Sequence, residues 1–119
     1  MEVDLIEING INIAVLRSIG IMIRETQDAL DLMAEASYLN SSKIIINEDQ
    51  ISPEFFDLKT GIAGEILQKF STYNLRLAII GDFSKFKSKS LKDFIIESNK
   101  YGRINFVSSL EEAKEKLSR

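Results

Sequence analysis

The chain contains no histidine and no cysteine among its 119 residues. This composition removes the imidazole base of the usual hydrolytic triads, the thiolate nucleophile and the side chains that most often bind zinc. A disulfide framework is excluded for the same reason. The sequence therefore favours a protein without a classical catalytic site, and it gives no reason to expect a cofactor or a bound metal.

Proline occurs once, glycine six times, and the apolar runs are short and interrupted by charge. An apolar content of 45% with 28% charged residues is typical of a folded globular chain rather than a disordered one. A length of 119 residues suits one hydrophobic core. We therefore expect a single cytoplasmic domain over residues 1–119, with no membrane segment and no secretory signal.

The net charge is −3, from 15 basic and 18 acidic residues, so the chain has no general attraction for nucleic acid or for anionic membranes. One local exception is a run of four lysines, Lys85, Lys87, Lys89 and Lys92. Such a run is typical of a solvated loop that leads into a helix. We expect neither nucleic acid nor a membrane as a partner.

Short β-rich runs alternate with amphipathic segments along the chain. The β-rich runs are residues 3–8, 11–16, 43–47, 75–80 and 104–107. The helical segments begin near Thr26, Thr60, Ser90 and Ser109. Asn9-Gly10 joins the first two runs and supplies the positive φ angles of a two-residue hairpin turn. The order ββαβαβαβα predicts an α/β domain with a mostly parallel sheet and an antiparallel edge strand at the N-terminus.

Four hydroxyl residues mark the expected helix starts. Thr26 and Thr60 are the predicted caps of the first two helices, and Ser90 begins the third. Ser109 with Glu112 has the spacing of a capping box for the last helix.

Polar residues follow the predicted parallel strands. Because ligands of open α/β sheets meet the loops at the carboxyl ends of strands, Asn47, Asp57, Asp82 and Ser84 are candidate contacts for a ligand or a partner. The carboxylates of Asp57 and Asp82 would also suit metal binding or acid and base chemistry. The alternative is that both aspartates are turn or cap residues.

Thr60 and its neighbours have two interpretations. In the first, the Thr60 hydroxyl caps a helix, an interaction worth about 1 kcal/mol, and Gly61 and Gly64 let that helix approach the sheet closely. In the second, Thr60 is a phosphoacceptor, or it binds an anion together with Lys59 and Gly61 at the helix terminus. The segment has no Walker ending and no dinucleotide fingerprint.

Four large apolar residues lie between the second strand and the first helix, where polar residues are usual: Ile19, Ile21, Met22 and Ile23. They would either cover one end of the core or form an exposed patch for a homodimer or another partner.

Three separated segments carry a family resemblance: FFDLKTGIAGEILQKF, LAIIGDFS and SKSLKDFIIESNK. They resemble a bacterial family known as domain of unknown function 4180, which has no established activity. The order of elements and the place of Thr60-Gly61 are more remotely similar to the sulfate transporter and anti-sigma factor antagonist (STAS, SpoIIAA-like) domain.

In the STAS domain, a partner kinase phosphorylates the hydroxyl residue before the glycine to switch binding. The resemblance therefore implies a regulatory role for Thr60. The present sequence departs from that motif in two ways, since Leu58 and Lys59 separate Asp57 from Thr60 and threonine replaces the usual serine.

Together these features predict a non-enzymatic regulatory module that binds a protein partner. The alternative is a small-ligand or nucleotide-binding domain with its site at the carboxyl ends of the parallel strands.

Overall fold

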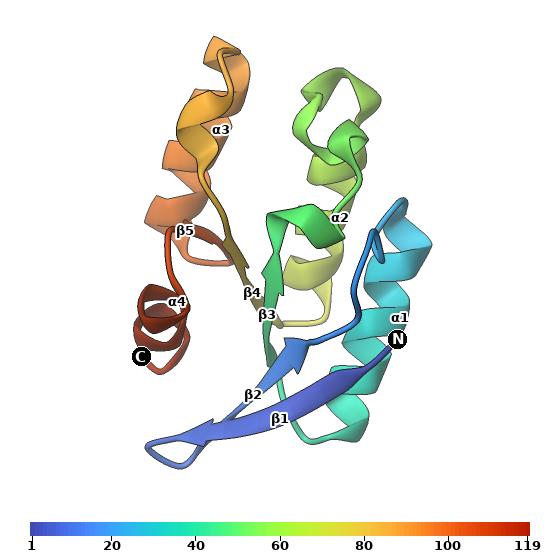
Figure 1. The fold of residues 1–119 in the computed structure, drawn as a ribbon, viewed down its shortest axis with the longest axis vertical. Helices are drawn as coiled ribbons and strands as arrows, with labels where there is room; N and C mark the ends of the chain where they lie inside the picture. Colours follow the sequence, from blue (N-terminus) through green and yellow to red (C-terminus); the bar gives the residue numbers. More distant parts are fainter.

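A computed structural model describes all residues, 1–119, and it has the predicted ββαβαβαβα order (Figure 1). The strands are β1 (Val3–Ile8), β2 (Ile11–Leu16), β3 (Lys43–Asn47), β4 (Arg76–Ile80) and β5 (Ile104–Val107). The α-helices are α1 (Thr26–Tyr38), α2 (Ile62–Thr72), α3 (Lys89–Tyr101) and α4 (Leu110–Leu117). The short 3-10 helices are η1 (Glu48–Gln50), η2 (Pro53–Phe56), η3 (Leu58–Thr60) and η4 (Phe83–Lys85). No helix has both the length and the apolar character that a membrane crossing requires.

The five strands form one sheet in the order β1-β2-β3-β4-β5. Strands β1 and β2 are antiparallel, and Asn9 and Gly10 turn between them with φ angles of 53° and 79°. The other pairs are parallel, as predicted. Because the strands follow one another in both sequence and space, the crossover helices α1, α2 and α3 succeed one another along one side of the sheet (Figure 1).

Helices α1, α2 and α3 cover one face of the sheet. Alternation along the strands places Ile44 and Leu77 on this face, where they share one apolar cluster with Leu32 of α1 and Ile66 and Phe70 of α2. This cluster is the main core of the domain.

Helix α4 covers part of the opposite face. Its Ala113 and Leu117 are fully buried against a second cluster that includes Ile45, Ala78 and Val107. The register aligns Ile45 with Ala78, so small and branched side chains leave room for the helix. The fold is therefore a three-layer α/β arrangement with unequal helix layers.

The predicted helix starts are accurate to within about one turn, but Thr26 and Ser90 are not the caps of their helices. Glu25, not Thr26, is the N-cap of α1, where it forms a capping box with Asp28. The Thr26 hydroxyl instead donates to Glu65 of α2 at 2.7 Å and links the two helices. Ser88, two residues before Ser90, caps α3.

One of the two hydrogen bonds of the predicted capping box at α4 is present. The Ser109 hydroxyl accepts from the backbone N–H of Glu112 at 3.1 Å. The Glu112 carboxylate, however, accepts from the N–H of Ser108 at 2.8 Å rather than from that of Ser109. The box is thus extended by one residue toward β5.

Gln50 is buried and connects β2 with β3 at the carboxyl edge of the sheet. Its side-chain amide donates to the carbonyl oxygens of Leu16 and Ser18 at 3.0 and 2.8 Å, and it accepts from the N–H of Asn47 at 2.7 Å. Its own carbonyl accepts from the N–H of Ile23 at 3.0 Å. One side chain therefore fixes the two loops that follow these strands.

Replacement of Gln50 by leucine is expected to lower the free energy of unfolding by at least about 2 kcal/mol, because it leaves buried backbone groups without partners. The matched control is Gln68→Leu on the exposed face of α2, which we expect to change stability by less than about 0.5 kcal/mol. Urea denaturation of both variants measures the difference. Equal losses would show that Gln50 has no special role in stability.

Candidate functional site

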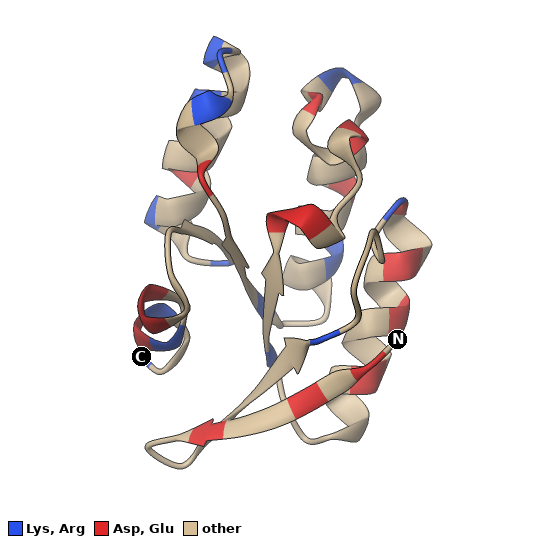
Figure 2. Cartoon of the chain, in the orientation of Figure 1, with Lys and Arg blue, Asp and Glu red and all other residues tan.

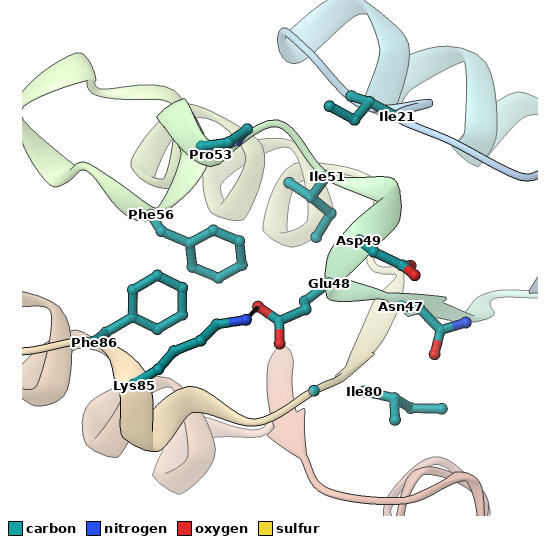
Figure 3. A pocket seen from close by; sticks show the side chains of 11 residues that line it. Ile21, Asn47, Glu48, Asp49, Ile51, Pro53, Phe56, Ile80, Lys85 and Phe86 are labelled. Carbon is teal, nitrogen blue, oxygen red and sulfur yellow. Dashed lines mark ion pairs between the residues drawn. The ribbon is translucent and has the colours of Figure 1, made fainter.

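A cavity of about 580 Å³ opens at the carboxyl ends of β3 and β4, and we call it the carboxyl-edge pocket (Figure 3). Its walls come from η1, η2, η4 and the loop before α1, so four segments distant in sequence meet there. The apolar lining residues are Ile21, Ile51, Pro53, Phe56, Ile80 and Phe86. The others are Asn47, Glu48, Asp49, Gly81 and Lys85.

The carboxylate of Glu48 is the best-fixed polar group of the pocket. Its Oε1 accepts from the N–H of Asp82 at 3.1 Å, and its Oε2 forms an ion pair with Nζ of Lys85 at 2.8 Å. The Glu48 side chain is 17% exposed, whereas that of Lys85 is 56% exposed. Figure 3 shows the two side chains extending toward each other across the pocket. Glu48 therefore joins the loop after β3 to the loop after β4.

Because Gly81 has no side chain, it leaves room for the Glu48 carboxylate in this position. A Cβ atom at residue 81 would lie 2.7 Å from Glu48 Oε1 and 2.9 Å from its Cγ and Cδ. Real side chains do not tolerate such distances, so any larger residue would displace the carboxylate. The glycine after β4 is thus explained by a close approach and not by its φ angle.

Phenylalanine side chains form the wall beside the ion pair. The rings of Phe56 and Phe86 stack with their centroids 4.8 Å apart and an interplanar angle of 17°. Nζ of Lys85 lies 5.5 Å from the centroid of Phe86, within the range of a cation–π contact. Phe83 extends the cluster to Phe106 of β5 through an edge-to-face contact at 5.2 Å. Since these rings come from η2, η4 and β5, they support the pocket on a connected apolar base.

Only some of the residues singled out in the sequence reach this pocket. Asn47 and Ile21 line it. Asp82 and Ser84 lie on the adjacent loop, where Asp82 contacts Glu48 through its backbone N–H. Asp57 is the N-cap of η3 and Thr60 is its last residue, and neither lines the pocket.

The two candidate aspartates each serve the short helix that follows them. Oδ1 of Asp57 accepts from the N–H of Lys59 at 3.2 Å, and Oδ1 of Asp82 accepts from the N–H of Ser84 at 3.1 Å. The Ser84 hydroxyl and N–H hold the pKa of Asp82 below its usual value. No group of three or more carboxylates is close enough to hold a metal ion. This geometry matches the interpretation of both residues as caps.

Thr60 is the last residue of η3 and lies one residue before Gly61, the N-cap of α2, which begins at Ile62. Its hydroxyl lies 2.8 Å from the carbonyl oxygen of Glu54 and 2.9 Å from that of Asp57, and it accepts from the N–H of Ile62 at 3.3 Å. The residue is exposed, but its oxygen is used within the turn. A role as phosphoacceptor stays a prediction.

Gly61 and Gly64, the glycines near Thr60, do not have the structural role expected of them. Gly61, the N-cap of α2, has a φ angle of 79°, which is a left-handed conformation. No atom lies within 4 Å of a Cβ built at Gly61 or at Gly64. The expectation that these glycines allow a close helix–sheet contact is therefore wrong. Lys59 is exposed beside them.

The apolar segment before α1 is divided between surface and core. Ile19 is 96% exposed, whereas Ile23 is 3% exposed and pairs with Ile51 through an isolated parallel bridge. Ile21 and Met22 are half-buried. Ile23 thus covers one end of the core, and only the preceding residues are accessible to a partner.

Local sequence patterns do not predict the residues that matter most in the pocket. Glu48 lies in an expected loop, but nothing in its neighbourhood predicts that its carboxylate turns inward. Lys85 belongs to the lysine run, which is typical of a solvated loop. Phe56 and Phe86 lie thirty residues apart, so no local sequence pattern predicts that their rings stack. Long-range stacking of this kind is set by the tertiary fold.

A family model described as Domain of unknown function (DUF4180) matches residues 8–117. The chain belongs to this family. The match runs from the end of β1 to the end of α4, so it includes every segment of the pocket. No curated protein and no solved structure matches the chain. The more remote similarity of this DUF4180 domain to the STAS domain stays a prediction.

In this DUF4180 domain, Gly81→Ala is expected to lower the free energy of unfolding by about 0.5–1.5 kcal/mol, because the new methyl group displaces the end of the Glu48 side chain from the N–H of Asp82 and from Lys85. Gly64→Ala is the matched control, since its site in α2 is open and alanine favours a helix by about 0.5–1 kcal/mol. Chemical denaturation should therefore give changes of opposite sign. The same sign for both variants would contradict the assigned role of Gly81.

Removal of the Thr60 hydroxyl tests its role in the turn. We expect Thr60→Val to lower the free energy of unfolding by about 1 kcal/mol, and Thr60→Ser to retain most of the stability because the oxygen remains. Thermal or urea denaturation distinguishes the two variants. Equal stability of valine and threonine at this position would leave the hydroxyl without a structural role.

Proposed function

We propose that this DUF4180 domain is a non-enzymatic regulatory module that binds a protein partner through the carboxyl-edge pocket. The observation that supports this proposal most strongly is the fixed Glu48–Lys85 ion pair beside the stacked rings of Phe56 and Phe86. A charged pair next to aromatic side chains provides both orientation and apolar contact area for a partner.

The shape of the pocket favours a macromolecular partner. Asn47, Asp49, Pro53 and Lys85 on its rim are exposed, so the cavity is open to solvent. Sites for small molecules usually bury most of the ligand surface. An open groove suits a partner that inserts one or two side chains and covers the rim with its own surface.

The polar groups near the pocket also favour binding over catalysis. The Glu48 carboxylate is engaged by Lys85 and by the N–H of Asp82. The Asp82 carboxylate in turn is engaged by the hydroxyl and the N–H of Ser84. A nucleophile needs an adjacent base to activate it, and these contacts join acceptors to donors that stabilise loops.

Site-specific photo-crosslinking tests the proposal. A photoreactive amino acid in place of Asp49, at the pocket rim, is expected to give one defined protein adduct in the native cells. The same amino acid in place of Tyr38, which is 85% exposed on α1, should not give that adduct. An adduct common to both positions, or no adduct from either, would reject the pocket as a partner surface.

Charge reversal at the pocket sharpens this test. Lys85→Glu places a second carboxylate beside Glu48, and we expect it to reduce the Asp49 adduct about tenfold, equivalent to about 1.4 kcal/mol of binding free energy. Lys87→Glu is the matched control, because Lys87 is exposed two residues away and does not line the pocket. Similar losses in both variants would indicate only a general effect of net charge.

A small ligand is the second candidate for the same pocket, because 580 Å³ falls within the range of about 300–1,000 Å³ for such sites. Native mass spectrometry of the protein from its own cells would then detect a retained small molecule. Ile21→Trp fills the pocket and should abolish retention, whereas Ile19→Trp, on an exposed residue outside it, should not. Equal retention by both variants would place the molecule elsewhere.

A further inference from the structure

Four basic side chains gather at the amino edge of the sheet, opposite the carboxyl-edge pocket. We call Lys43, Arg76, Arg103 and Arg119 the amino-edge cluster. Lys43 and Arg76 are the first residues of β3 and β4 and are direct partners in the sheet register. The N–H of Leu77 donates to the carbonyl oxygen of Arg103 at 2.9 Å, so β5 begins beside them. Figure 2 shows basic positions at the starts of β3 and β4.

The cluster is held by uncharged acceptors. Nε of Arg76 donates to the carbonyl oxygen of Gly102 at 2.9 Å, and its Nη2 donates to that of Lys116 at 3.0 Å. Nη1 of Arg103 donates to Oδ1 of Asn74 and to the carbonyl oxygen of Leu75, both at 3.1 Å. None of the five ion pairs of the domain includes Lys43, Arg76 or Arg103.

Only Arg119 has a carboxylate partner, Glu115, at 2.9 Å. Nζ of Lys43 lies 3.5 Å from the main-chain oxygen of Arg119. Several of these carbonyl groups belong to the ends of α3 and α4, where positive charge is favourable. The carbonyl groups of Gly102, Lys116 and Leu75 satisfy guanidinium donors but carry no net charge, so the positive charges of Arg76 and Arg103 remain without an ion-pair partner.

This arrangement has an electrostatic cost. Like charges directly opposite each other on adjacent strands are destabilising. Lys43, Arg76 and Arg103 are also partly withdrawn from solvent, which weakens screening. Burial lowers the pKa of Lys43 and the charge of Arg76 lowers it further, while burial and the charges of Arg103 and Arg119 lower the pKa of Arg76. An anion at this edge would remove the repulsion.

We propose that the amino-edge cluster binds a phosphate group, either as inorganic phosphate or as a phosphate monoester. Nη1 of Arg76, Nε and Nη2 of Arg103, and two of the three ammonium protons of Lys43 make no hydrogen bond within the chain. Planar guanidinium groups match the oxygen geometry of phosphate, and a dianion compensates more than one cation. A single carboxylate would leave most of the charge uncompensated.

Calorimetric titration with inorganic phosphate, at an ionic strength matched with sodium chloride, tests the site. We expect binding by the native domain, at least about tenfold weaker binding by Lys43→Gln and by Arg103→Gln, and unchanged binding by the exposed control Lys92→Gln. Phosphate that binds no better than chloride, or an equal loss in Lys92→Gln, would overturn the proposal.

Thermal unfolding without phosphate gives a second, independent readout. Lys43→Gln removes a cation opposite Arg76, so we expect the variant to melt at a higher temperature than the native domain while it loses phosphate binding. A lysine with a purely structural role would instead lower the melting temperature, and that result would overturn the proposal.

The source of the phosphate is distinguished by repeating the titration with O-phosphoserine. Tighter binding of O-phosphoserine than of inorganic phosphate would assign the site to phosphorylated molecules. Equal or weaker binding would assign it to free phosphate. Both results uphold a phosphate site, whereas no binding of either compound would reject it.

Discussion

The buried amide of Gln50 holds the carboxyl edge of the sheet in one arrangement. It joins the carbonyl oxygens of Leu16 and Ser18, at the end of β2, to the N–H of Asn47, at the end of β3. A buried amide is stable only when its donors and acceptor all have partners, so the loops cannot move separately without leaving polar groups unpaired. The position of η1, and with it that of Glu48, follows from this constraint.

The carboxyl-edge pocket depends on a second constraint at the neighbouring strand. Gly81 lies so close to Glu48 that no side chain fits between them, and the carboxylate then reaches both the N–H of Asp82 and Lys85. Gln50 therefore couples the loop after β2 to the loop after β3, and Glu48 couples the loop after β3 to the loop after β4. Stacked rings of Phe56 and Phe86 close the wall. This coupling makes the pocket a pre-organised surface rather than a gap between mobile loops.

The sequence predicted the fold better than the site, for a physical reason. Strand runs, the Asn9-Gly10 turn and the alternation of elements are local patterns, and the structure confirms the resulting α/β order. The roles of Gln50 and Gly81 are set by partners that lie more than thirty residues away, and no local period encodes them. Thr60 is the clearest case, because its pattern suggested a helix cap whereas a short 3-10 helix precedes α2 and uses the hydroxyl inside the turn.

The two edges of the sheet differ in how their charged side chains are paired. At the carboxyl edge, Lys85 has a nearby carboxylate in Glu48 at 2.8 Å. At the amino edge, Lys43 faces Arg76 directly, and neither forms an ion pair with an aspartate or glutamate side chain. Arg76 has a structural role, since it donates to the carbonyl oxygens of Gly102 and Lys116, but these contacts do not offset the repulsion from the opposed cation Lys43. The juxtaposition of the two cations therefore points to a negative group supplied from outside the chain, on the edge of the sheet farthest from the pocket.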